Sequence, residues 1–217
     1  MKLQTHSLLG PRAFTLIEAL VLVAMLAIVF SLIPCATPSA KARARRVSCI
    51  NNLKQVGLAF NLYANDHGQQ FPWTLPLTST GTLEFADSPQ VFKHFAAITN
   101  ELITPKVLAC PSDTQRIKAT NFTRLSNTNL SYFIALDADE SKPQRLLSGD
   151  RNITGGILSN SFLRLLPKNA AAGWTTELHN KVGNIGLADG SVQQVTPVGL
   201  RKQLQAQDRP VIRLAIP

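Results

Sequence analysis

The stretch of sequence that most constrains the fold lies near the N-terminus, where residues 14–33 read FTLIEALVLVAMLAIVFSLI. Twenty residues in a helix are about the length that crosses the hydrocarbon core of a membrane. Glu18 is the one charged residue in this run. A carboxylate inside a membrane helix costs roughly 2.5–3.5 kcal/mol on insertion scales, so its presence predicts a partner. A glutamate near the helix end that reaches toward the membrane surface is the alternative interpretation.

The residues before the apolar run form a short, mildly basic leader, MKLQTHSLLGPRA, at positions 1–13. An ordinary secretory signal has a shorter apolar core that is followed by small residues at the cleavage point. Here the apolar run is long, and Pro34 and Ser39 occupy positions where the cleavage site of a secretory signal has small residues. The leader therefore indicates a processing signal of another kind.

Residues 13–18, AFTLIE, closely resemble the cleavage signal of type IV prepilins. The resemblance implies a cut between Ala13 and Phe14 by a prepilin peptidase and methylation of the new N-terminus. It also implies that Glu18 pairs with the free α-amino group of a neighbouring subunit during assembly. Ala13 departs from the glycine that is usual before the cut, and we expect this small residue to be processed, at a lower rate.

The formal net charge is +9, and basic residues follow the apolar run closely. Such a cluster beside a predicted membrane span favours contact with phospholipid headgroups, with a nucleic-acid partner as the less favoured alternative. These charges conflict with the positive-inside rule, because only Lys2 and Arg12 precede the run. The cleavage signal decides the orientation: a single-pass inner-membrane protein with its C-terminal domain on the periplasmic side. The basic cluster is Lys41, Arg43, Arg45 and Arg46.

The helical pattern continues beyond the apolar run. Apolar residues recur at spacings of four, three, four and three, which is one face of an amphipathic helix. Pro34 interrupts the helix and is expected to kink it. The turn-forming residues 65–68, NDHG, predict its end. We therefore expect one long helix, with residues 14–33 as the transmembrane half and residues 34–66 as the envelope-side half. The apolar face is Cys49, Leu53, Val56, Phe60 and Tyr63.

The remainder predicts a globular α+β domain at residues 67–206, followed by a loose tail at 207–217. A loop is expected at 69–89 and a short helix at 89–100. Asp189-Gly190 between alternating segments predicts a two-residue hairpin turn, and Thr196-Pro197 predicts the start of a last helix. Strands are expected at 106–109, 130–136, 145–147, 156–158, 184–188 and 191–195.

A second resemblance covers nearly the whole chain. Residues 42–72 and 110–113 resemble segments of a large group of type II secretion pseudopilins. That group carries a C-terminal signature of His, nine residues, then Asp-Gly, which His179, Asp189 and Gly190 match. The resemblance implies a pilin-like fold, in which a long N-terminal helix, half of it transmembrane, packs on a small antiparallel β-sheet domain. It implies an assembly role and no enzymatic one.

The signature residues are also the best candidates for chemistry. Asp189 at a turn chiefly stabilises the turn itself. The resemblance also raises a Ca²⁺ site at Asp189, since some related proteins hold Ca²⁺ in a C-terminal loop. Ca²⁺ needs six to eight oxygen ligands, and only Glu177 is a further acidic residue nearby. His179 is expected to make a structural hydrogen bond. The acidic run 137–140, DADE, is read as a solvated loop, with a cation site as the alternative.

Three cysteines leave room for one disulfide in an oxidising compartment. Cys49 lies on the apolar helix face and Cys110 ends a predicted core strand, whereas Cys35 lies at the membrane boundary. We predict a Cys49–Cys110 bridge, and two buried free thiols are the alternative.

The leading hypothesis is a structural subunit, a pseudopilin or pilin-like protein incorporated in a pilus or secretion pseudopilus. Its expected partners are prepilin peptidase, other pilin or pseudopilin subunits and membrane lipids, with no cofactor and no small-molecule substrate. A minor pilin that binds DNA or a surface through its basic residues is the alternative. A membrane-tethered envelope enzyme is a third hypothesis, but no Walker loop, G-x-S-x-G or H-E-x-x-H motif occurs.

Overall fold

The structure is a computed structural model of the 217-residue chain, and it describes residues 14–31 and 38–217. The chain divides into two compact units, residues 1–40 and 41–217. The predicted leader with Ala13, the predicted helix kink at Pro34, and Cys35 lie outside the described residues.

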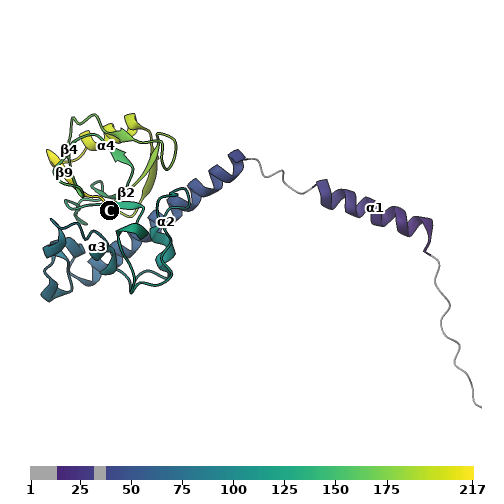
Figure 1. Cartoon of the computed structure of the whole chain (residues 1–217), viewed down its shortest axis with the longest axis horizontal. Helices are drawn as coiled ribbons and strands as arrows, with labels where there is room; N and C mark the ends of the chain where they lie inside the picture. Colours follow the sequence, from purple (N-terminus) through teal and green to yellow (C-terminus); the bar gives the residue numbers. More distant parts are fainter. Residues whose placement is uncertain (1–13, 32–37) are drawn as a thin grey trace, which may run out of the picture. The chain divides into compact units, whose positions relative to one another are not determined.

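Helix α1 spans Leu16–Ser31 (Figure 1). Its large apolar side chains are exposed all round, as expected for a sequence that is apolar on every face. None of the helices in the described ranges is both long enough and apolar enough to cross a membrane.

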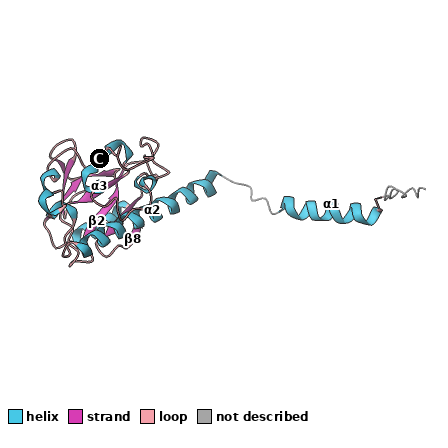
Figure 2. Cartoon of the chain, turned by 90° about the horizontal axis from the view of Figure 1, so that it is seen from below, coloured by secondary structure: helices cyan, strands magenta, loops and turns pink. Residues whose placement is uncertain are grey.

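Helix α2 spans Pro38–Asp66, and its apolar face packs into the domain (Figures 1 and 2). The helix ends where the chain turns left-handed at Gly68, with φ of 66°. The amide of Gln69 then donates to the carbonyl of Ala64, which satisfies one of the last helical acceptors. The predicted apolar face is confirmed, because each of its members is at most 2% exposed: Cys49, Leu53, Val56, Phe60 and Tyr63.

Within the described residues, seven strands form one antiparallel sheet in the order β4-β5-β9-β1-β2-β7-β8. Two further short strands, β3 and β6, pair separately. The structure is therefore α+β with an antiparallel sheet. The strands are β1 (Tyr132–Ala135), β2 (Leu146–Asp150), β3 (Ile153–Thr154), β4 (Ile157–Leu158), β5 (Leu163–Pro167), β6 (Gly173–Trp174), β7 (Gly183–Leu187), β8 (Val192–Val195) and β9 (Val211–Ala215).

The sheet separates two apolar clusters. On one side, α2 and the segment that follows it, including α3 (Phe92–Ala96), pack against Tyr132 and Ile134 of β1. On the other side, α4 (Pro197–Gln205) places Leu200 and Leu204 against the sheet. The side chain of Thr196 caps α4, as the sequence predicts.

Two predicted elements are wrong. Residues 106–109 are not a strand, because Pro105–Leu108 forms the 3₁₀ turn η4, in which the side chain of Thr104 accepts from the amide of Lys106. The segment 207–217 is not a loose tail, because its residues form β9 between β5 and β1. β9 buries Ile212 and Leu214, so the end of the chain belongs to the core.

Other predictions differ in extent. The loop at 69–89 contains three 3₁₀ turns, η1 (Pro72–Thr74), η2 (Leu77–Ser79) and η3 (Leu83–Phe85). The helix expected at 89–100 shortens to the five residues of α3. The predicted hairpin forms, but its loop has three residues, since the amide of Leu187 donates to the carbonyl of Ser191. The strands at 130–136, 145–147 and 156–158 correspond to β1, β2 and β4 with shifted ends.

Candidate functional site

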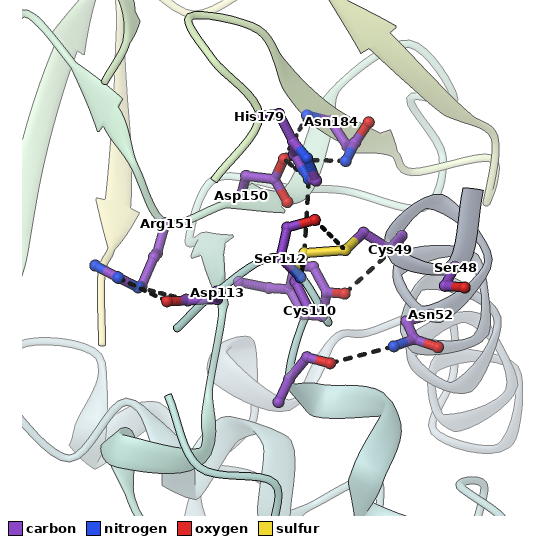
Figure 3. The surroundings of a disulfide bond; sticks show 12 residues. Ser48, Cys49, Asn52, Cys110, Ser112, Asp113, Asp150, Arg151, His179 and Asn184 are labelled. Atoms are coloured by element: carbon purple, nitrogen blue, oxygen red, sulfur yellow. Dashed lines mark hydrogen bonds and ion pairs between the residues drawn. A yellow bond between two sulfur atoms is a disulfide. The ribbon is translucent and has the colours of Figure 1, made fainter. Parts of the chain in front are cut away.

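The candidate functional site lies where α2 packs against the domain, and it is centred on a disulfide between Cys49 and Cys110 (Figure 3). Their Cα atoms are 4.9 Å apart, within the range that a bridge requires. These are the two cysteines that the sequence analysis selects. Cys49 comes from α2, and Cys110 comes from the loop that follows η4.

Three hydrogen bonds accompany the disulfide along the same face of α2. The guanidinium of Arg46 donates to the carbonyl of His179 at 3.0 Å, and the amide of Asn52 donates to the carbonyl of Ala109 at 3.2 Å. The hydroxyl of Tyr132 on β1 donates to the carbonyl of Cys49 at 3.3 Å. The helix is therefore held by covalent and polar ties as well as by apolar packing. We call this set of ties the junction.

His179 lies at the centre of the junction with its side chain fully buried. Its Nε2 is 3.6 Å from the sulfur of Cys110 and 3.5 Å from Oδ2 of Asp150 at the end of β2. The same carboxylate oxygen accepts from the backbone amide of Asn184 at 2.8 Å and from its side-chain amide at 3.0 Å. Figure 3 shows these side chains converging beside the disulfide.

The electrostatics of this pair follow from burial. Burial, together with the nearby charge of Arg46, lowers the pKa of His179 to about 4. Burial also raises the pKa of Asp150 to about 7, against the opposing hydrogen bonds from Asn184. The imidazole is therefore neutral at pH 7, and the carboxyl group is close to its titration midpoint.

Residues 110–113, the segment that carries Cys110, make further polar contacts beside the junction. The backbone amide of Ser112 donates to the sulfur of Cys110 at 3.4 Å. Asp113 accepts two hydrogen bonds from Arg151, at 2.7 and 2.9 Å. Burial alone would raise the pKa of Asp113, but Arg151 and the neighbouring hydrogen bonds outweigh it and lower that pKa. This bidentate pair ties the loop that carries Cys110 to the residue after Asp150.

This cluster does not fit a metal ion while the bridge is closed. The sulfur atoms of Cys49 and Cys110 and a ring nitrogen of His179 all lie within 4.8 Å of one another. Zinc is bound by thiolates, however, and both sulfurs here belong to the disulfide. His179 and Asp150 alone leave the coordination incomplete. The arrangement of these side chains suits a rigid structural joint.

The Asp189-Gly190 part of the signature lies elsewhere on α2. Asp189 is exposed, and its carboxylate accepts from the amide of Ser191 at 2.8 Å, so it stabilises its own turn. Gly190 has φ of 77°, and a Cβ there would approach the side chain of Asn61. In the described chain, no hydrogen bond or ion pair links His179 with Asp189. The two signature elements are thus separate contacts with one helix.

The calcium prediction gains no support from this geometry. Among the described residues, Cys49, Cys110 and His179 lie close enough together to share a metal ion. Asp189 does not belong to this group. In the acidic run 137–140, two carboxylates are already engaged by arginines. Asp137 accepts from Arg213 at 2.9 Å, and Asp139 pairs with Arg145 at 3.3 Å.

Glu18 in α1 has a local partner that the sequence analysis missed. Its carboxylate accepts from the backbone amide of Thr15 at 2.9 Å, and the hydroxyl of Thr15 accepts from the amide of Glu18 at 3.3 Å. This reciprocal arrangement is a capping box, and the pattern T-x-x-E before an apolar run signals it. Phe14, the predicted mature N-terminus, is 70% exposed.

Other residues of the junction were also missed. Asp150, Arg151 and Asn184 lie far in sequence from Cys49, and they belong to no recognisable sequence motif. The alternation of polar residues in β2, with Ser148 and Asp150 fully buried, is the one local signal that could have indicated them.

Comparisons with known proteins give one match. Residues 38–87 match a protein family described as "Protein of unknown function (DUF1559)". The matched region contains the whole of α2 and the first 3₁₀ turns after it. No curated protein and no solved structure shows significant similarity to the chain.

Proposed function

We propose that this chain is a prepilin-like assembly subunit, processed by a prepilin peptidase and incorporated in a pilus or pseudopilus. In this proposal, residues 14–33 anchor the chain in the inner membrane before assembly. The domain lies on the periplasmic side, where an oxidising environment preserves the Cys49–Cys110 bridge.

The observation that carries the proposal is the exposure of α1. Its large apolar side chains are between 46% and 83% exposed in the described chain. Exposed apolar surface on this scale indicates a lipid or protein partner. Lipid would cover these side chains before assembly, and the helices of neighbouring subunits would cover them after it. The AFTLIE segment resembles a prepilin cleavage signal, so it favours a helix that moves from lipid into a filament over one that stays in the membrane.

A second observation concerns the outer face of α2. Opposite the face that packs on the domain, Val47, Leu58 and Leu62 are 46–57% exposed. Leu58 and Leu62 are four residues apart, so they are neighbours on the helix surface. This short apolar patch is suited to contact with a neighbouring subunit.

The experiment concerns Glu18, whose proposed role is a charge pair with the amino group of the next subunit. The capping box gives a competing local role, so two variants are needed. Glu18→Gln keeps an oxygen that can accept from the amide of Thr15 but removes the charge, whereas Glu18→Ala removes both. Incorporation is measured by shearing cells and quantifying the protein in the released filament fraction.

We expect both variants to be retained in the membrane and lost from the filament fraction by at least tenfold. Normal assembly of the glutamine variant with loss only for alanine would mean that Glu18 acts through helix capping. Normal assembly of both variants would contradict the proposed charge pair.

A further inference from the structure

A polar pocket of about 240 Å³ lies beside the first turns of α2, next to the junction. One wall is helical, where Ala42, Arg45 and Arg46 are spaced three and four residues apart and share a face. The other wall comes from the loop between β6 and β7. The residues of that loop at the pocket are Thr176, Leu178, His179 and Asn180, and Ser112 completes the lining.

The loop wall is held in place. Arg46 donates one hydrogen bond to the carbonyl of His179. The next two residues, Asn180 and Lys181, both adopt left-handed backbone conformations, with φ of 54° and 63°. Such conformations are uncommon for residues other than glycine and persist where surrounding contacts enforce them. The pocket is therefore a fixed feature of the loop and the helix.

The pocket is positively charged. Its lining includes two arginines and no carboxylate. In the described chain, neither Arg45 nor Arg46 pairs with an acidic side chain, and the nearby Glu177 faces Arg151 at 3.5 Å. A guanidinium has five N–H donors, so Arg46 keeps most of its donors after bonding to His179. Because burial keeps the pKa of His179 near 4, the imidazole adds no charge at pH 7.

We propose that this pocket binds the phosphate of an anionic phospholipid headgroup. Arginine matches phosphate oxygens in a bidentate geometry, and the hydroxyl groups of Ser112 and Thr176 offer further donors. The pocket is smaller than the roughly 300–1,000 Å³ of sites that enclose drug-sized ligands, so it suits a headgroup. Its helical wall begins nine residues after the end of the apolar run at Ile33, close to where headgroups would lie.

A nucleic acid fits less well. Binding to a nucleic-acid backbone needs several cations along a groove, often with aromatic side chains for the bases. This lining provides two cations and no aromatic side chain except the imidazole of His179. The inference rests on the proposed membrane location, but lipid binding in detergent is measured without filament assembly, so the two proposals fail separately.

The test uses the full-length chain in a nonionic detergent and native mass spectrometry with short-chain lipids. Phosphatidylglycerol is the probe, phosphatidylcholine is the neutral comparison, and inorganic phosphate is the competitor. The variants are Arg45→Gln and the double variant Arg45→Gln/Arg46→Gln. Arg43→Gln is the matched control, because Arg43 has the same charge on the same helix but does not line the pocket.

We expect phosphatidylglycerol to bind at least fivefold more tightly than phosphatidylcholine. Arg45→Gln should weaken binding about threefold and the double variant at least tenfold, while Arg43→Gln stays within twofold of the unmodified chain. Arg45 is exposed and forms no hydrogen bond or ion pair through its side chain in the described residues, so this single variant remains informative if the double variant unfolds.

Three results would overturn the proposal. Equal losses for Arg43→Gln and Arg45→Gln would indicate diffuse attraction by the basic cluster. Unchanged binding by a folded double variant would exclude the pocket. Full competition by inorganic phosphate at the lipid's own concentration would show a site for free phosphate.

Discussion

The apolar residues of α1 and α2 have very different surroundings. In α1, Leu16 is 83% exposed and even Val21 is 46% exposed, whereas Leu53, Val56 and Phe60 of α2 have no exposed area. α2 is also joined to the domain by the disulfide and the three hydrogen bonds of the junction. The comparison teaches that the chain itself supplies the packing partners of α2, whereas under the proposed function lipid and neighbouring subunits supply those of α1. An assembly subunit needs both kinds of helix.

The largest expected difference is between shortening the chain at its C-terminal end and shortening it at its N-terminal end. Deleting residues 211–217 removes β9 from between β5 and β1, so we expect the domain not to fold. Deleting residues 1–33 removes α1, and we expect the unfolding free energy of the domain to change by less than about 0.5 kcal/mol. Chemical denaturation followed by circular dichroism measures both. A folded protein without residues 211–217 would contradict the position of β9.

The disulfide is the next largest difference between the two helices. In a Cys35→Ala background, which excludes other pairings, the double variant Cys49→Ala/Cys110→Ala should lose about 4 kcal/mol of stability, less any strain. The bridge spans 61 residues, and the loss follows from the greater freedom of the unfolded chain. Unfolding in urea, with and without a reductant, measures the effect.

The control is the unmodified chain, which should fall to the stability of the double variant once it is reduced. If the reductant leaves the stability of the unmodified chain unchanged, the two thiols are free and the predicted bridge is absent.

Two leucines on opposite faces of α2 give a matched pair. Leu53→Ala should cost about 2–5 kcal/mol, because the side chain is fully buried and a cavity remains. Leu58→Ala, at a residue that is 57% exposed, should cost less than about 0.5 kcal/mol in the isolated subunit yet reduce incorporation into filaments. If Leu58→Ala leaves incorporation unchanged, the outer face of α2 is not a subunit contact.

The smallest net effect is a pH dependence at the junction, because two contributions to stability oppose each other there. Folding raises the pKa of Asp150 from 3.8 to about 7, so its contribution to stability is present below pH 4 and is lost as the pH rises through 7. Folding lowers the pKa of His179 from 6.5 to about 4, so its contribution is present above pH 6.5 and is lost as the pH falls through 4. The two contributions oppose each other between pH 4 and 7.

Asp150→Asn removes the titrating carboxyl group, and with it one of the two opposing contributions to stability. It keeps an oxygen that can accept from Asn184. The stability of the variant, relative to the unmodified chain, should therefore rise between pH 4 and 7, by at most about 1.4 kcal/mol per pH unit. Thermal unfolding across this range measures it. Parallel pH profiles for the two proteins would contradict the raised pKa.

Much of the fold could be predicted from local signals. The apolar face and the end of α2, and the Asp-Gly turn between β7 and β8, each depend on a few neighbouring residues, and they were predicted to within a residue. The start of α2 is Pro38, four residues after the predicted start at 34. β9 was missed because a short strand near a terminus, after a polar segment, reads as a tail. Its alternation of exposed Arg213 with buried Ile212 and Leu214 was the available signal. Thr104-Pro105, a cap followed by proline, likewise indicated a helical turn at η4.

The site was predictable only in part. Cys49 could be selected because it lies on the apolar face of the predicted helix, whereas Cys35 lies at the predicted membrane boundary. Cys110 was selected correctly, although the strand that it was expected to end is the 3₁₀ turn η4. The surroundings of His179 could not be predicted, because Asp150 and Cys110 are 29 and 69 residues away in sequence, and tertiary packing alone brings them together. Burial then sets their pKa values, and apart from the alternation of Ser148 and Asp150 in β2 no residue pattern indicates that burial.

The most direct test of the central claim is the N-terminal residue of the protein in its native envelope. Mass spectrometry of the N-terminal peptide should find a chain that starts at Phe14 and carries an added methyl group. That result would show that the leader of residues 1–13 is removed and that the apolar run remains attached for assembly. A mature chain that starts at Met1, or at any residue after Pro34, would contradict the account.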